Sequence, residues 1–165
     1  METAIVGMGC FWCSEAIYQS LRGVQKVESG YAKAAGSVNS IEVARIQFDP
    51  EVITYEDLLL VFWELHDPTQ ANGQGYDIGP EYQSAIFYCN SKQKDIAIRS
   101  KETYELTHTL TRPVVTRIEP FGSFSLAATF HQDFYKKNPE NRLCKVIISP
   151  KLAKLRKIFG HLEKE

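Results

Sequence analysis

Cys10 and Cys13 are the residues whose type and spacing most directly suggest chemistry. The apolar run Thr3–Gly9 predicts a buried strand, and apolar residues at helical spacing predict a helix over Phe11–Leu21. Cys10 is therefore expected at a strand-to-helix junction, where helix N–H groups and the helix dipole stabilise a thiolate. A cysteine with a pKa of about 8.5 is about 3% ionised at pH 7, whereas one with a pKa near 7 is about half ionised. We interpret Cys10 as a candidate nucleophile.

Cys13 supplies a second thiol three residues further on. Positions i and i+3 at the start of a helix come within the roughly 5.5 Å between Cα atoms that a disulfide requires. Cys13 is therefore a candidate resolving thiol. One alternative is that both cysteines are small buried residues. Another is half of a zinc site, but no second C-x-x-C motif supplies the usual partner ligands, so we expect no metal.

Phe11 and Trp12 lie between the two cysteines. Two large aromatic side chains beside a nucleophile form an apolar wall suited to a small alkyl group such as an S-methyl. The alternative is that both belong to the hydrophobic core. Their adjacency to Cys10 makes the two interpretations comparable.

The remaining pattern predicts the elements that position these residues. A turn-rich loop over 67–83 is long enough to suggest a functional role. The order β-α-β-β-α-β of the first six elements indicates an α+β fold of the split-βαβ type, a ferredoxin-like plait forming a two-layer sandwich with C-terminal additions. Beyond the first strand and helix, the predicted elements are strands Val24–Ala32 and Ile41–Phe48, a helix capped by Thr54, strand Ser84–Cys89, helix Lys92–Leu110, strand Val114–Glu119, a short helix near His131–Lys137, a strand at Lys145–Ile148 and a C-terminal helix from Lys151.

Bulk composition narrows the class of protein. The chain has 165 residues, 44% hydrophobic and 24% charged, which predicts one globular domain spanning residues 1–165. A net charge of −1 gives no attraction to nucleic acid or anionic membranes. No secretory signal is recognisable, and the longest apolar run, Leu58–Trp63, is far shorter than the roughly 20 residues of a membrane span. We expect a cytoplasmic monomer without nucleic-acid or membrane partners.

The segment Gly9–Glu15, GCFWCSE, resembles the G-C-F-W-x-x-E signature of peptide methionine sulfoxide reductase A. Further segments resemble the family in the family's order, so the resemblance spans nearly the whole chain. They are Gly30-Tyr31, Glu42–Pro50, Val61–Thr69, Gln74–Phe87, His131–Pro139 and Pro150–Lys157.

The resemblance implies a function and a reductant. Cys10 would be the nucleophile, and Phe11 and Trp12 would form the methyl pocket. The substrate would be the S epimer of methionine sulfoxide, free or in oxidised proteins. An external dithiol, usually thioredoxin, would regenerate the enzyme without any bound cofactor.

Glu42, Asp77 and Tyr82 match polar residues of the family's site, with Glu42 as the acid that protonates the sulfoxide oxygen. The pattern adds that Glu42 shares a strand face with Ala44 and Ile46, where burial would raise its pKa. The alternatives are an exposed strand-end glutamate, a turn residue at Asp77 and a loop aromatic at Tyr82.

Two cysteines compete to resolve the oxidised nucleophile. Cys13 is close and stands where many relatives have glycine, and we favour it. Cys144 lies near the C-terminus, where the family often keeps a recycling cysteine, and its alternative is a buried residue. Cys89 ends an apolar strand and is expected to be structural.

The chain departs from the family at two places. Residues 32–41 are shorter than the usual glycine-rich segment, and a second tyrosine near the sulfoxide oxygen has no counterpart. Ahead of His131 the chain has Ala127-Ala128-Thr129-Phe130, so two carboxylates of the family's Ala-Glu-Asp-Tyr are missing.

Two other functions compete with this one. A thioredoxin-like thiol–disulfide oxidoreductase would explain the C-x-x-C motif and Arg112-Pro113 before a strand, but not Phe-Trp between the cysteines. A weakly active relative that binds oxidised-methionine peptides would explain the shortened segment.

Overall fold

The computed structural model describes residues 1–164, and helices and strands alternate along most of the chain. The strands are β1 (Glu2–Met8), β2 (Val24–Ala34), β3 (Ile41–Phe48), β4 (Gly73–Gln74), β5 (Asp77–Ile78), β6 (Ser84–Tyr88) and β7 (Arg117–Leu126). The α-helices are α1 (Phe11–Gln19), α2 (Tyr55–Glu64), α3 (Ser91–Thr107), α4 (Phe134–Lys137) and α5 (Ser149–Phe159). Cys144–Ile148 form a π-helical segment, and 3₁₀ turns cover Pro80–Tyr82, Thr129–His131 and Gly160–Leu162.

Five strands form a closed barrel in the order β1-β3-β2-β7-β6, with β6 pairing back to β1. Neighbours are antiparallel except β6 and β7, which are parallel and joined through α3. The first six elements follow the predicted order β-α-β-β-α-β, so the mixture of helices and strands is confirmed. The sheet differs from the open layer of the predicted plait, because β7 pairs with both β2 and β6 and closes it.

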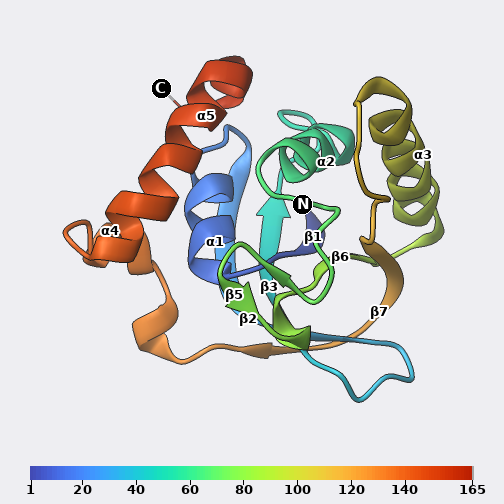
Figure 1. Ribbon diagram of the computed structural model, residues 1–165, viewed down its shortest axis with the longest axis horizontal. Coiled ribbons are helices and arrows are strands. Elements are labelled where there is room, and N and C mark those ends of the chain that lie inside the picture. The colour runs from blue at the N-terminus through green and yellow to red at the C-terminus, as the bar shows by residue number, and fades with distance from the viewer. Residues whose placement is uncertain (165) are drawn as a thin grey trace.

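The two faces of the strands meet different surroundings, because successive side chains point to opposite sides. Small and branched residues such as Ile5, Val43 and Ala85 fill the barrel. Their neighbours in the sequence, including Val6 and Ala44, pack beneath the helices in the main core. Figure 1 shows α1, α4 and α5 at one end of the molecule and α2 and α3 at the other.

The C-terminal half differs most from the sequence prediction. The predicted strand at Lys145–Ile148 is wrong, since those residues are π-helical and lead directly into α5. β7 begins at Arg117 and runs to Leu126, which is longer and later than predicted. Cys89 is exposed rather than structural. Predictions from local sequence patterns agree better with the structure in the first half of the chain, where Thr54 and Asp57 form the expected capping box of α2.

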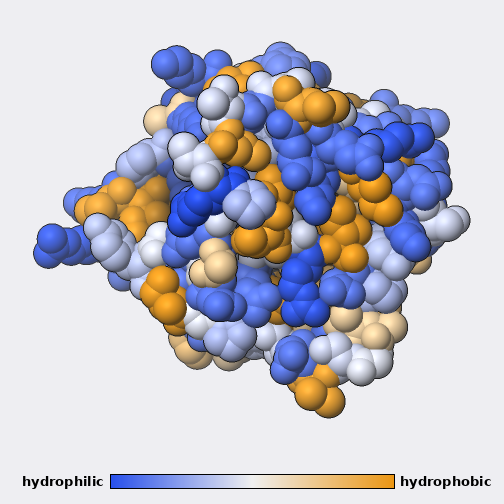
Figure 2. Space-filling view, turned by 45° about the vertical axis from the view of Figure 1, so that its right-hand side comes forward, coloured by the Kyte–Doolittle hydropathy of each residue, from blue (hydrophilic) through white to orange (hydrophobic). Residues whose placement is uncertain are grey.

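Within residues 1–164, no helix is both long and apolar enough to cross a bilayer. Figure 2 shows apolar side chains set among hydrophilic ones on one face. Exposed large apolar residues include Tyr76, Ile78 and Phe130.

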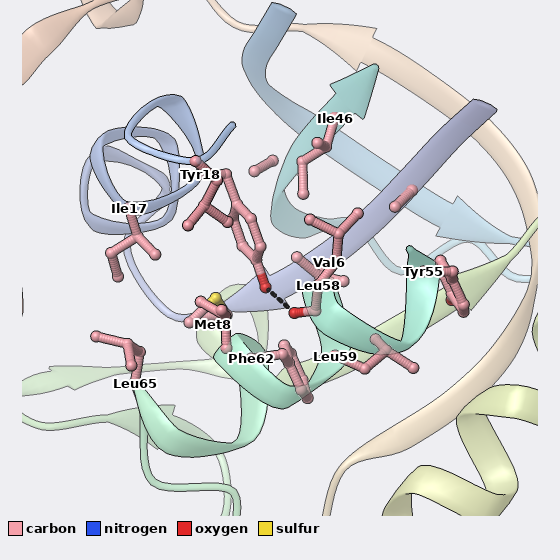
Figure 3. Close-up of a cluster of buried hydrophobic side chains, with 14 of the residues drawn as sticks. Val6, Met8, Ile17, Tyr18, Ile46, Tyr55, Leu58, Leu59, Phe62 and Leu65 are labelled. Carbon is pink, nitrogen blue, oxygen red and sulfur yellow. Dashed lines mark hydrogen bonds between the residues drawn. The ribbon is translucent and has the colours of Figure 1, made fainter. Parts of the chain in front are cut away.

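The core contains one polar contact that joins α1 to α2. Tyr18 is fully buried, and its hydroxyl donates to the Leu58 carbonyl oxygen at 2.9 Å (Figure 3). Apolar side chains, including Met8 and Phe62, surround this contact. A hydrogen bond in such surroundings is protected from competition with water.

We predict that Tyr18→Phe lowers the free energy of unfolding by about 1 kcal/mol, because it removes this buried hydrogen bond while keeping the ring. Urea denaturation followed by circular dichroism measures the change. Tyr76→Phe, at a side chain 96% exposed, is the matched control and should leave the midpoint unchanged. Equal midpoints for the Tyr18 variant and the parent would contradict the prediction.

Candidate active site

Cys10 lies at the junction predicted from the sequence, as the residue that precedes α1. Gly9 before it has φ +91°, a conformation that favours glycine. A Cβ on Gly9 would lie 2.5 Å from Cβ of Gln74, so the β4–β5 hairpin packs directly against this turn. Glycine is therefore required here twice, for the backbone angle and for the close approach of the hairpin.

Three of the four cysteines lie together. Cys10 is half-buried, while Cys13 and Cys144 are buried in one apolar cluster that Cys10 packs against. The charge of a Cys13 thiolate raises the pKa of Cys144, after the larger effect of burial. Both candidate resolving cysteines therefore lie near the nucleophile, and the distant sequence position of Cys144 is no obstacle.

The Cys10 and Cys13 thiols shift each other's pKa in opposite directions. A hydrogen bond to Cys13, together with burial, raises the pKa of Cys10, and the same hydrogen bond lowers the pKa of Cys13. The first negative charge of the pair therefore rests on Cys13, with Cys10 as the donor. This differs from the sequence expectation, in which the helix N-terminus alone lowered the pKa of Cys10, because burial and the neighbouring thiol outweigh it.

Glu42 reaches the start of α1 from β3. Its Oε1 accepts a hydrogen bond from the Phe11 N–H at 3.3 Å. The pKa of Glu42 is raised to about 7, chiefly by burial and less by the charges of Asp77 and Glu81, while the hydrogen bond from the Phe11 N–H opposes the rise. The carboxyl group therefore exchanges its proton near neutral pH, the range in which a general acid is most effective.

Asp77 and Tyr82 come from the segment between α2 and β6. Asp77 is in β5, and Tyr82 ends the 3₁₀ turn that follows. The pKa of Tyr82 is raised by burial and then by charges on Glu42, Asp77, Glu81 and Cys10. The hydroxyl group of Tyr82 is thus held protonated, as a hydrogen-bond donor must be, close to the nucleophile and to the carboxyl groups.

Phe11 and Trp12 are held by aromatic contacts. Trp12 stacks on Phe134 with ring centroids 3.7 Å apart and planes at 5°, and its Nε1–H donates to Nδ1 of His131 at 3.1 Å. Phe11 is buried and meets Tyr31 edge-on at 5.5 Å. Trp12 stays partly exposed. Phe11 and Trp12 therefore form an aromatic wall in which one face of Trp12 is fixed against Phe134 and part of Trp12 remains accessible to solvent.

A cleft of about 400 Å³ opens beside the cysteines. Its walls come from the β1–α1 junction, the β4–β5 hairpin and the segment leading into α5. Asp77 and Lys151 are the charged residues among those that line it. The lining residues are Met8, Cys10, Cys13, Gln74, Gly75, Tyr76, Asp77, Leu143, Ile147 and Lys151.

Several residues around the site were not singled out by sequence reasoning. His131 and Phe134 anchor Trp12, and their signal was the His131–Pro139 segment, which the sequence showed only as a resemblance. Tyr31 lies directly opposite Glu42 on β2, and its pKa is raised by burial and by the Glu42 charge. Glu15 is buried and accepts from the Phe134 N–H at 3.3 Å, which steadies the start of α4.

The described residues do not suggest a metal centre. Among residues 1–164, no group of three or more His, Cys, Asp or Glu side chains is arranged to hold a metal ion.

Comparison with known proteins points to one family. A family model described as peptide methionine sulfoxide reductase matches residues 2–163. A peptide methionine sulfoxide reductase MsrA from Deinococcus radiodurans is 44% identical over 170 residues, covering 96% of this chain and 82% of the relative. One from Chromobacterium violaceum is 42% identical over 173 residues and covers 98% of each chain.

Solved structures agree with the sequence comparison. Mxr1 from Saccharomyces cerevisiae in reduced form has a TM-score of 0.77 and 27% identity, covering 85% of this chain and 87% of that one. Methionine sulfoxide reductase A of Corynebacterium diphtheriae has a TM-score of 0.71 and 25% identity, covering 85% and 76%. Mxr1 in complex with Trx2 has a TM-score of 0.62 and, at 22% identity, supports the fold alone.

Proposed function

The chain belongs to the peptide methionine sulfoxide reductase family, and from that membership we propose that it reduces methionine S-sulfoxide by attack of Cys10 on the sulfoxide sulfur, with Glu42 as the acid. The observation that carries this assignment of roles is the Phe11 N–H to Glu42 hydrogen bond, which joins the acid to the residue after the nucleophile. The carboxyl group of Glu42 is thus bound to the backbone of Phe11, the residue that directly follows Cys10. A sulfoxide seated there would meet sulfur on one side and a proton on the other.

The first step moves two protons. A sulfoxide oxygen is a poor leaving group until it is protonated, and Glu42, with a pKa of about 7, retains a proton to give near neutrality. As the Cys10 sulfur attacks, its own proton passes to the Cys13 thiolate. The attack forms a bond between the Cys10 sulfur and the methionine sulfur. The protonated oxygen then passes from the methionine sulfur to Cys10 as that S–S bond breaks, so methionine leaves, Cys10 becomes a sulfenic acid, Glu42 is left as a carboxylate and Cys13 as a thiol.

The second step converts the sulfenic acid at Cys10 to a disulfide. Cys13 loses its proton and attacks the Cys10 sulfur, and the hydroxyl group departs as water. Tyr82 and Asp77 would hold the substrate through its oxygen and its backbone, and Phe11 and Trp12 would seat the methyl group. The burial of Phe11 and the stacking of Trp12 on Phe134 support that pocket.

The reductant is proposed to be thioredoxin, with no bound cofactor. Mxr1, a relative at 27% identity, has been crystallised in complex with Trx2, which supports a partner of that class. The substrates would be oxidised proteins or free methionine sulfoxide. The single catalytic domain over residues 1–165 and the cytoplasmic monomer stay predictions.

The test of this function is a single turnover without thioredoxin. We expect one methionine per chain from the S epimer and none from the R epimer, and none from Cys10→Ser, because the attacking sulfur is gone. Cys89→Ser, at the exposed cysteine, is the matched control and should match the parent. A stoichiometric yield of methionine from Cys10→Ser would remove Cys10 from the mechanism.

Glu42→Gln should lower the first-turnover rate roughly 10²- to 10⁴-fold, because an amide cannot donate the proton. The parent rate should fall as pH rises through about 7, where Glu42 loses its proton, and rise with pH on the acid side as the thiol pair ionises. The variant should lose only the alkaline fall. Rapid-quench measurement of methionine at several pH values checks both, and a fall that persists in the variant would assign it to another group.

Peptide mass spectrometry after one turnover should find Cys10 linked to Cys13. Cys144 is also buried, but Cys13 is one turn from Cys10, and its backbone N–H donates to the Cys10 carbonyl oxygen at 3.2 Å. In Cys13→Ser, the sulfenic acid at Cys10 should persist long enough to be trapped by dimedone. A Cys10–Cys144 linkage in the parent as the first product would show that Cys144 resolves.

A further inference from the structure

The cleft beside the cysteines carries a cation that the proposed mechanism does not use. Lys151, the third residue of α5, lines the same cleft as Cys10 and Cys13. Its side chain is half-buried, although lysine normally extends into solvent. Within residues 1–164, it has no ion pair and no hydrogen-bond partner for its ammonium group.

The other lysines of this region behave differently. Lys154 is exposed and donates to the Glu64 carbonyl oxygen at 2.7 Å, and Lys145 pairs with Glu140 at 2.6 Å. Lys157 is exposed on the same helix as Lys151. Lys151 is thus distinguished by its place in the wall of the cleft that Cys10 and Cys13 also line.

We propose that Lys151 is a positioning residue for the resolving step, in which its ammonium group stabilises the Cys13 thiolate that attacks oxidised Cys10. The proposal rests on the function proposed above and extends it to a residue that the mechanism left without a role. α5 packs against α1, and Leu152, the next residue, packs against the apolar cluster that contains Cys13. The cation is therefore carried on a fixed element rather than on a free loop.

Burial and three neighbouring groups shift the pKa of Cys13. The Cys10 thiol donates to it and lowers its pKa, burial raises it, the Lys151 charge lowers it, and the Asp77 charge from the hairpin raises it. Cys144 lies in the same buried cluster as an uncharged thiol. Once Cys10 is a sulfenic acid, the hydrogen bond from its thiol is lost. Lys151 then remains as the group that favours the Cys13 thiolate over the thiol.

The step is balanced without Lys151 changing its own protonation. Cys13 gives its proton to the Glu42 carboxylate, the S–S bond forms as the S–O bond of Cys10 breaks, and the departing hydroxide takes that proton back to leave as water. Cys13 is oxidised and Cys10 is reduced from sulfenic acid to disulfide. Lys151 acts only through the charge on Cys13.

Removing the Lys151 charge should change the rate of the resolving step only modestly, and the direction of the change depends on pH. Loss of the Lys151 charge removes one of the effects that lower the pKa of Cys13, so a smaller fraction of Cys13 is thiolate at any pH below that pKa. A more basic thiolate is also more nucleophilic, which offsets part of the loss of rate at these pH values. Above the raised pKa the variant should equal or exceed the parent.

The experiment compares the parent with Lys151→Met, Lys151→Arg and the control Lys157→Met. Two rates are measured between pH 5.5 and 9.5: alkylation of Cys13 by iodoacetamide in substrate-free protein, and formation of the Cys10–Cys13 disulfide after one turnover of methionine S-sulfoxide. Both profiles of Lys151→Met should move to the alkaline side of the parent profiles. Lys151→Arg and Lys157→Met should follow the parent, since each keeps a cation on the cleft.

The two measurements, alkylation of Cys13 and disulfide formation after one turnover, test this inference separately from the proposed function. An alkylation profile of Lys151→Met that coincides with the parent profile would overturn the role of Lys151, whatever the chain does with sulfoxides. If the parent released no methionine, the proposed function would fail and the role in resolution with it, even with a shifted alkylation profile. A rate loss of equal size at every pH would also overturn the proposal, because misplacement of Cys13 alone does not move a titration.

Discussion

The turn from β1 into α1 is the constraint on which the site depends. Gly9, at φ +91° and in close contact with Gln74, directs the chain so that Cys10 precedes the helix and the Phe11 N–H points at Glu42. The same approach brings the β4–β5 hairpin, and with it Asp77, beside the cysteines. A side chain at Gly9 would clash with Gln74 and so displace the nucleophile and the hairpin from one another. The nucleophile, the acid and the substrate-binding segment are therefore set by one backbone geometry.

The second feature of the site is which of its groups, Glu42, Cys10 and Cys13, carry a proton. Burial and neighbouring carboxylates raise the pKa of Glu42 to about 7, while the pKa of Cys10 is raised and that of Cys13 is lowered, so that Cys13 ionises first. An acid that holds its proton and a thiolate beside the attacking thiol are what reduction of a sulfoxide needs, since oxygen must gain a proton as sulfur loses one. The barrel face that carries Glu42 and the start of α1 thus act as one electrostatic unit.

The segment after β7 supports the aromatic wall from behind. His131 accepts from Trp12, Phe134 stacks on it, and Gln132 binds the backbone of Ser29 through both its amide nitrogen and its oxygen. Buried Glu15 holds the Phe134 N–H. These contacts tie α4 to α1 and β2, so that Trp12 keeps its orientation while its edge stays open to solvent. The two carboxylates missing ahead of His131 leave this clamp intact, because none of its contacts uses those positions.

The sequence by itself determined the local features: the strand-to-helix junction at Cys10, the capping box of Thr54 and Asp57, the face shared by Glu42 and Ala44, and the order of the first six elements. Each follows from periodicity or from contacts a few residues apart. Only the tertiary structure decided that β7 closes the barrel and that Lys145–Ile148 is helical, because both depend on packing against distant strands and helices. The same holds for the raised pKa of Glu42, the meeting of Cys13 with Cys144 and Lys151, and the support of Trp12 by His131. Burial and charge at a site are sums over residues that are far apart in the chain, and no local pattern encodes them.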